Sequence, residues 1–439
     1  MVRDLFSSHA LFAGRYRMDR LLGKGERKET FLAWDTKASR PVAISVVLRD
    51  NDQRATRQEV EMLGRTGAHD NIVILYDFDL GSVPQYLVFE YLPGGQLRDY
   101  CRALQSERKE MPLADFFRIA RQLCRALAHI HERGVIHRDV STSNIWLDER
   151  RVVHVGDFDT AISVEDAAAG GTSAPTTEGY SAPELIAGAP QDARADLYSL
   201  GAVLHELLVG DGPMTSTDPL AAVEPPSRSR RDVPPSLDAI ILSMLAIDPA
   251  DRPTSADEVL GLLREIEATA NLATLIANGE NDTVEFKQTM RWDVKQARIN
   301  DEDILRESVK TVCAFLNSVG GTLLIGVADN RHFVGLDDDL KNRKDDRKEA
   351  KTVDWFERTF RQALTDCLKP DMNHLVTVWF PIVDGVQICR VDVKASAEPI
   401  FLVIKNITEF YIRQGNLSRR LDIKSALDYV RQHWSSSTP

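Results

Sequence analysis

The chain has 439 residues, enough for two or three domains that each bury a core. Its net charge of -12 argues against a protein that coats nucleic acid by charge alone, and no run of 18 apolar residues is present to span a membrane. The first 20 residues carry several charges and do not form a signal peptide. The five cysteines have no CxxC spacing, which excludes a disulfide framework and a zinc site. We therefore expect a cytoplasmic protein with reduced thiols.

The first predicted elements are a glycine-containing turn, Gly23-Lys-Gly25, and a strand, Val42-Ala43-Ile44-Ser45. The strand matches the V-A-I-K motif that holds ATP in phosphoryl-transfer enzymes, but Ser45 replaces the lysine. Phosphoryl transfer needs a cation near the phosphates, balanced by an acid such as Glu59. Lys28 is our candidate cation and Lys24 a weaker one. The alternative is that Lys28 is a solvated hairpin charge.

The central part of the chain contains three polar side chains at the spacing that phosphoryl transfer requires. Asp139 and Asn144 lie in HRDVSTSN, and Asp157 follows in VGDFD. Such an Asn and a D-F-G Asp hold two metal ions on the phosphates, while the loop Asp receives the hydroxyl proton. We predict that Asn144 and Asp157 bind Mg²⁺ or Mn²⁺ and that Asp139 is the catalytic base.

Further motifs follow the predicted metal site. Residues 181–184 match the A-P-E motif, and Asp196 and Asp248 begin two more motif-like segments. The small, hydroxyl-rich segment 167–177 occupies the activation-loop position, and a merely flexible loop is equally consistent with it. Its candidate phosphorylation sites, with Arg138 as phosphate partner, are Thr172, Ser173 and Thr176.

Together these motifs resemble the eukaryotic-like serine/threonine protein kinases of bacteria over residues 16–268, after an N-terminal segment of residues 1–15. The resemblance implies a bilobal kinase fold, a protein substrate with Ser or Thr, and an ATP hinge at residues 89–92. The nucleotide contacts that it implies are Gly23, Gly25, Lys28, Ala43, Glu59, Glu90, Leu92 and Trp146. Lys28 in the glycine-rich loop is similar to the loop lysine of with-no-lysine kinases. Ser141 and Asp159 depart from the pattern, replacing a catalytic-loop lysine and the D-F-G glycine.

A helix with apolar residues at helical spacing is predicted over residues 255–277, and Asn278-Gly279 then forms a turn. We assign residues 269–278 to a connector and residues 279–439 to a second domain. The first 271 residues hold 30 Lys and Arg against 41 Asp and Glu, so the acidity belongs to the first domain. Basic clusters lie at residues 341–348 and 419–420. Interspersed acids favour a solvated helix face for the clusters at residues 341–348, with a nucleic-acid contact as the less favoured alternative.

The second domain begins with an alternating strand, Thr283–Lys287, in which Glu285 and Lys287 share one face. Such a pair can hold a divalent metal and orient a water molecule, although most pairs of this kind are solvated. A helix over residues 304–318, Gly320-Gly321 and a buried strand over residues 322–328 follow, and Asp329 ends that strand.

This order, ENDTVEFK, then AFLNSVGGTLLIGVAD, then YIRQGN, resembles the Schlafen AlbA-type domain. The resemblance implies an α+β domain with a mixed sheet. It also implies a metal-dependent site for cleaving structured RNA such as tRNA, with Glu280, Glu285 and Asp329 as metal ligands beside Lys287. Nucleic-acid binding without cleavage and a protein-interaction role are the alternatives.

The sequence therefore predicts a serine/threonine kinase fused to a Schlafen-like nuclease, a pairing that suits phage defence or a stress toxin. The alternative is a nucleotide-sensing pseudokinase that gates a nucleic-acid-binding module. The protein substrate, the trigger and the oligomeric state stay open.

Overall fold

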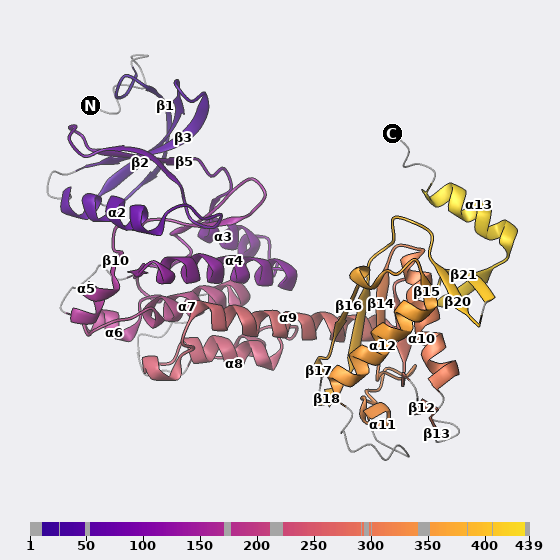
Figure 1. Cartoon of the computed structure of the whole chain (residues 1–439). Coiled ribbons are helices and arrows are strands. Elements are labelled where there is room, and N and C mark those ends of the chain that lie inside the picture. Colours follow the sequence, from indigo (N-terminus) through magenta and orange to yellow (C-terminus); the bar gives the residue numbers. More distant parts are fainter. Residues whose placement is uncertain are drawn as a thin grey trace. The chain divides into compact units, whose positions relative to one another are not determined.

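The computed structural model describes residues 11–25, 27–48, 53–170, 177–210, 223–290, 292–293, 298–299, 301–340, 352–383, 385–405 and 407–434. The chain divides into two compact units, Met1–Glu267 and Ala268–Pro439 (Figure 1). Within the described ranges, no helix is long and apolar enough to cross a membrane. The candidate phosphorylation sites at positions 172, 173 and 176 and the basic cluster at residues 341–348 lie outside these ranges.

The first unit begins with a five-stranded antiparallel sheet in the order β1-β2-β3-β5-β4. Its strands are β1 (Tyr16–Lys24), β2 (Lys28–Asp35), β3 (Arg40–Val47), β4 (Leu75–Asp79) and β5 (Tyr86–Glu90). Along β2, Phe31 and Ala33 are buried in the sheet's own core. Because side chains alternate along a strand, Lys28 and Thr30 lie on the opposite face. Helix α2 (Gln53–Thr66) follows β3.

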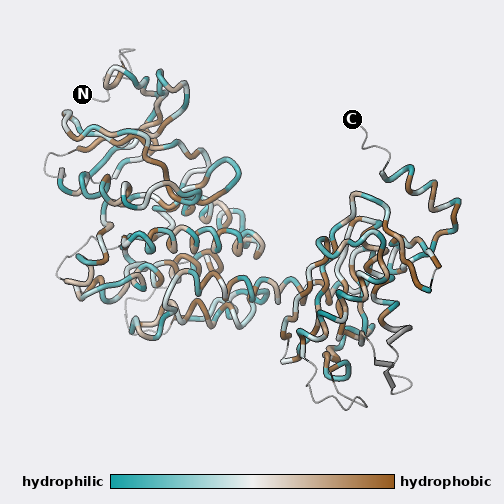
Figure 2. The backbone as a smooth tube through the Cα atoms, viewed as in Figure 1, coloured by the Kyte–Doolittle hydropathy of each residue, from teal (hydrophilic) through white to brown (hydrophobic). Residues whose placement is uncertain are grey.

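The rest of the first unit is mainly helical and is packed around the long helices α4 and α7 (Figure 1). The helices are α3 (Leu97–Ser106), α4 (Leu113–Glu132), α5 (Val164–Ala169), α6 (Pro183–Ile186), α7 (Arg194–Val209), α8 (Pro235–Met244) and α9 (Ala256–Asn278), with 3₁₀ turns η2 (Pro226–Arg228) and η3 (Pro249–Asp251). The short strands are β6 (Gly95–Gln96), β7 (Val135–Ile136), β8 (Ile145–Leu147), β9 (Val153–Val155) and β10 (Ile162–Ser163). Thirteen of the sixteen residues of α7 are buried, and Figure 2 shows hydrophobic residues along it. Burial on all sides makes α7 the centre of this lobe.

Helix α9 belongs to both units. Val259 and Leu263 pack into the helical core of the first unit, whereas Leu272 and Ile276 pack into a core of the second. The segment 269–278, which we assigned to a connector, is therefore helical and carries core residues. The helix ends at Asn278, and Gly279 follows with φ of 76°, a conformation that favours glycine.

The second unit contains two four-stranded sheets. In the first, β11 (Val284–Lys287) pairs parallel with β14 (Gly321–Ile325), and β19 (Cys389–Val393) and β16 (Val376–Trp379) continue it antiparallel. The second sheet is β15 (Leu368–Lys369), β20 (Phe401–Ile404), β21 (Ile407–Gln414) and β22 (Leu417–Leu421). Two short hairpins are β12 (Trp292–Asp293) with β13 (Arg298–Ile299), and β17 (Ile382–Val383) with β18 (Val386–Gln387). The predicted α+β fold with a mixed sheet is confirmed.

Helices α10 (Asp301–Leu316) and α12 (Val353–Cys367) cover the core of the second unit, with α11 (Asp337–Leu340), η4 (Asn373–Leu375) and α13 (Ile423–Trp434) completing it. Asn317 ends α10 and is fully buried. Its amide nitrogen donates to the carbonyl oxygens of Ile400 (2.7 Å) and Tyr411 (2.9 Å), and its amide oxygen accepts from the Ile400 N–H (2.8 Å). The Asn of the A-F-x-N-x-x-G-G segment is thus a structural bridge between α10 and the second sheet, because a buried amide needs such partners.

Candidate active site

A cavity of about 590 Å³ lies in the first unit between the sheet and the helical lobe. This volume suits a nucleotide-sized ligand. Its walls come from the glycine-containing turn, β3, α2, the segment after β5, and the loops around β8 and β9. Every cofactor-binding and metal-binding residue that we predicted for the first domain lines this cavity: Gly23, Gly25, Lys28, Ala43, Glu59, Glu90, Leu92, Asn144, Trp146 and Asp157.

Lys28 is the cation that we predicted for the phosphates, and it lines the cavity. Its ammonium donates a hydrogen bond to the Glu59 carboxylate in an ion pair in which the lysine side chain is 16% exposed and the acid 2%. Burial lowers the pKa of Lys28, but the Glu59 and Asp157 carboxylates outweigh it and hold that pKa above its ordinary value. Lys28 is therefore charged inside the cavity.

Lys24 also lines the cavity but is not buried in it. Its side chain is 61% exposed and lies 3.4 Å from Glu29, on the surface of the sheet. At the position of the missing lysine, the Ser45 hydroxyl lies 2.8 Å from the Thr30 hydroxyl on the neighbouring strand. The pairing of Thr30 with Ser45 across β2 and β3 places Lys28 on the same face of the sheet, two residues along.

The loop between β7 and β8 presents Asp139. One carboxylate oxygen accepts from the Thr177 hydroxyl (2.5 Å), and the other accepts from the Asn144 amide (2.6 Å). Burial raises the pKa of Asp139 above its ordinary value, while the Thr177 hydrogen bond opposes that rise. Buried Asp196 of α7 supports this loop, because its oxygens accept from the backbone N–H groups of Arg138 (2.8 Å) and His137 (2.9 Å).

Asp157 lines the cavity with φ of 61°, an uncommon value for a residue with a side chain. Gly156 before it approaches Trp146 closely: a Cβ there would lie 2.9 Å from a Val73 methyl carbon and 3.3 Å from the Trp146 ring. Only glycine leaves room for the Trp146 ring at this cavity wall.

A carboxylate and an amide, from Asp157 and Asn144, offer the oxygen ligands that Mg²⁺ and Mn²⁺ prefer. The amide nitrogen of Asn144 is used in the bond to Asp139, so its oxygen is the atom suited to a metal. The residues present therefore fit the predicted ions.

An ion pair that the motifs did not predict lies next to cavity residues in sequence. The Arg27 guanidinium, in the turn before β2, donates to the Asp159 carboxylate at 2.5 Å. We had noted Asp159 only as a departure from glycine. An acid in place of an expected glycine was the available signal, but its partner is 132 residues away in sequence.

The acids predicted for the second unit have structural partners. Buried Glu285 lies in an ion pair with Lys287 (2.5 Å) and in another with Arg413 (2.8 Å). The Glu280 carboxylate accepts from the Phe286 N–H (2.8 Å), and Asp329 lies on an exposed turn. Across the part of the chain that the structure describes, no three Asp, Glu, His or Cys side chains group closely enough to hold a metal. The site formed by Glu280, Glu285 and Asp329 stays a prediction.

Arg413, of the Y-I-R-x-G-N segment, was not among our site residues. Its guanidinium is buried and donates to the carbonyl oxygens of Asn281 (2.8 Å) and Val284 (3.0 Å) as well as pairing with Glu285. The alternative of a solvated Glu285 is therefore wrong: Glu285 is only 8% exposed, because the ion pair with Arg413 compensates its charge inside the unit.

Two family models match the chain. The protein kinase domain model matches residues 16–262, and the Schlafen AlbA_2 model matches residues 280–422. Among curated proteins, the serine/threonine-protein kinase PknB of Mycolicibacterium smegmatis is 34% identical over 279 residues, which cover 58% of this chain and 44% of that protein. The probable PknB of Corynebacterium glutamicum is 32% identical over 285 residues, covering 59% and 43%. The chain thus spans less than half the length of these relatives.

Proposed function

The chain belongs to the protein kinase family and carries a Schlafen AlbA_2 domain after the kinase domain, and we propose that its first unit is an active serine/threonine kinase in which Lys28 holds ATP. The observation that carries this proposal is the ion pair of Lys28 with Glu59 inside the cavity. In phosphoryl transfer the cation near the phosphates must be balanced by an acid. Lys28 meets that requirement from β2, although β3 carries Ser45.

Asp139, Asn144 and Asp157 supply the other groups that phosphoryl transfer needs. Asp139 receives the proton of the substrate hydroxyl, and Asn144 keeps its carboxylate oriented through their hydrogen bond. Asn144 and Asp157 would hold the divalent ions. When bound, such ions neutralise charge on the phosphates.

Removing the cation tests the proposal. Lys28→Ala should reduce transfer of label from ATP on the order of a hundredfold, because one preorganised charge is lost from the site. Lys24→Ala is the matched control and should have little effect, because Lys24 is mostly exposed. Ser45→Lys added to Lys28→Ala should restore part of the transfer.

Equal and small losses at positions 24 and 28 would contradict the role of Lys28. Binding of ATP by the unaltered protein without any transfer would instead favour the nucleotide-sensing pseudokinase.

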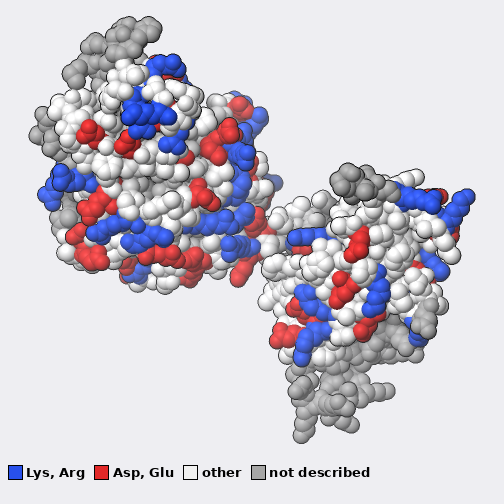
Figure 3. Space-filling model, turned by 45° about the horizontal axis from the view of Figure 1, so that its top comes forward, with Lys and Arg blue, Asp and Glu red and all other residues white. Residues whose placement is uncertain are grey.

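For the second unit we propose nucleic-acid binding. The match to the Schlafen AlbA_2 model supports it, and exposed Arg419 and Arg420 on the edge strand β22 are of the type that contacts phosphates. Figure 3 shows Lys and Arg interspersed with Asp and Glu on the visible face of this unit, so binding through local contacts is favoured over a uniformly basic surface.

Metal-dependent cleavage of structured RNA such as tRNA is the finer hypothesis for this unit. The residue types at Glu280, Glu285 and Asp329 support it, whereas the pairing of Glu285 with Arg413 weighs against it. Incubating the full chain with labelled tRNA, Mn²⁺ or Mg²⁺, with and without ATP, tests it. If the protein binds the RNA but does not cleave it under any of these conditions, the cleavage hypothesis is wrong and nucleic-acid binding remains the proposed function.

A further inference from the structure

We infer that Arg27 and Asp159 are a pair of positioning residues that hold the turn carrying Lys28 in place. The inference rests on the proposed role of Lys28 as the ATP-holding cation. It assigns a function to two residues that adjoin cavity residues in sequence, an arginine directly before Lys28 and an acid in place of the D-F-G glycine.

The need for such a pair follows from where Lys28 lies. A lysine at position 45 would be in the middle of β3, which pairs with both β2 and β5. Lys28 is instead the first residue of β2, directly after the turn from β1. A residue at a strand end next to a turn is held by fewer backbone hydrogen bonds, so its side chain is located less firmly.

The backbone hydrogen bonds of Gly25, Arg27 and Lys28, the described residues of the turn, run to the sheet. The Gly25 N–H donates to the Lys28 carbonyl oxygen (2.9 Å), and the Leu48 N–H donates to the Arg27 carbonyl oxygen (2.8 Å). Both bonds stay within the sheet. The Arg27 side chain reaches in the other direction, to Asp159, which follows the predicted metal ligand Asp157 by two residues.

The ion pair therefore connects the turn that carries Lys28 with the segment that carries Asp157. In our proposal these two residues act on the same phosphates. The side chains of the ion pair are 31% exposed at Arg27 and 13% exposed at Asp159, so water screens it only partly. A guanidinium with a carboxylate is the more directional form of ion pair, because its donors lie in a fixed plane.

Charge balance supports the same inference. A carboxylate added at position 159, near those of Glu59 and Asp157, would repel them in a poorly solvated cavity. The guanidinium of Arg27 compensates that added charge and leaves Lys28 paired with Glu59. Glycine at 159 and a neutral residue at 27 would need no such compensation, so the arginine and the acid are explained together.

The test is a double-mutant cycle in the full chain with Arg27→Gln, Asp159→Asn and both together. We expect each single variant to raise the KM for ATP roughly tenfold with a smaller change in kcat, and the double variant to be no worse than either. Arg27→Lys should recover part of the loss. Additive effects, or effects on kcat alone, would overturn the inference.

A second background separates this inference from the role of Lys28. In protein carrying both Lys28→Ala and Ser45→Lys, the cation is on β3, so Arg27→Gln should change ATP affinity less than twofold, measured by direct nucleotide binding. A tenfold loss there would show that the pair acts independently of Lys28 and would overturn the inference. If Lys28→Ala alone leaves transfer unchanged, the proposed function fails first, whatever the cycle shows.

Discussion

The two units treat their carboxylates differently. In the first unit, Asp157 lines a cavity together with the half-buried cation Lys28, and Asp139 is hydrogen-bonded to the cavity residue Asn144. In the second, Glu285 forms ion pairs with Lys287 and Arg413, and the Glu280 carboxylate accepts a hydrogen bond from the Phe286 N–H of β11. The same residue types at motif spacing thus form a site in one unit and internal ion pairs in the other.

The partner of an acid, more than its place in a motif, decides what the acid can do. A carboxylate in an ion pair with a buried guanidinium must lose that partner before it can bind a metal, and breaking such a pair is costly. Asp157, by contrast, lines the cavity, and its carboxylate helps to raise the pKa of Lys28.

The largest effect is expected for Asp157→Asn, which should abolish transfer of label from ATP, a loss of a hundredfold or more, because the metal loses its anionic ligand. The melting temperature should stay close to that of the unaltered protein, which separates a chemical defect from an unfolded one. Undiminished transfer would show that Asp157 is not needed for the reaction, and the proposed difference between the carboxylates of the two units would be wrong.

In the second unit the expected effect is on stability. Arg413→Ala should reduce the free energy of unfolding by about 3 to 5 kcal/mol, because it leaves Glu285 buried beside Lys287 alone. Arg419→Ala, at an exposed position of β22, is the matched control and should change it by less than about 0.5 kcal/mol.

The variant Glu285→Gln tests whether Glu285 has a structural or a catalytic role. If Glu285 is structural, this variant is less stable and RNA binding is otherwise retained. If it abolished Mn²⁺-dependent RNA cleavage without any loss of stability, the second unit would resemble the first, and the contrast would be wrong.

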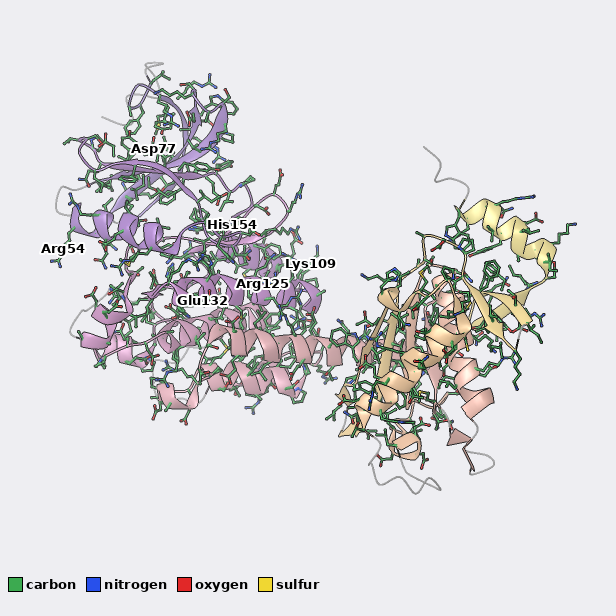
Figure 4. All side chains as sticks on the ribbon, in the orientation of Figure 1. Arg54, Asp77, Lys109, Arg125, Glu132 and His154 are labelled. Carbon is green, nitrogen blue, oxygen red and sulfur yellow. The ribbon has the colours of Figure 1, made fainter. Side chains whose placement is uncertain are left out.

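The smallest effect concerns a structural ion network within the first unit. Asp35 is buried, and the Arg15 guanidinium that donates to it at 2.8 and 2.6 Å holds its pKa at about 2; Arg15 also reaches Asp77, labelled on the sheet in Figure 4. A lowered folded pKa stabilises the protein above the ordinary value near 4, and the stabilisation is lost as the pH falls from about 4 to about 2.

Asp35→Asn should therefore cost on the order of 2 kcal/mol at pH 7 and make unfolding less dependent on pH below 4, measured by denaturant titration. An unchanged pH dependence would show that this pair contributes nothing to stability.

Local motifs predicted much of this molecule. The positions of Asp139, Asn144 and Asp157 follow from short segments whose backbone is fixed by neighbouring strands, and the resemblance of the glycine-rich loop to that of with-no-lysine kinases was enough to name Lys28 before Lys24. The helix and strand limits in the second unit differ from our predictions by a few residues, as for α10, which begins at Asp301 rather than 304.

Partners far apart in sequence could not be predicted. Arg27 pairs with Asp159 across 132 residues, and Arg413 donates to Asn281 across the same separation. No periodicity connects such residues, since their proximity is a result of how the strands are ordered. The charge of Glu285 looked available because its compensating cation lies on β21, near the end of the described chain.

The place of Arg413 also affects how the protein forms during translation. The first unit is contiguous and is complete once Glu267 has left the ribosome, so it can fold while synthesis continues. The second unit cannot complete its fold in this way. Asn281, Val284 and Glu285 emerge early, but the guanidinium that joins them is made 128 or more residues later. A nascent chain stalled before Arg413 would thus carry a finished kinase domain and an unfinished neighbour with an uncompensated acid.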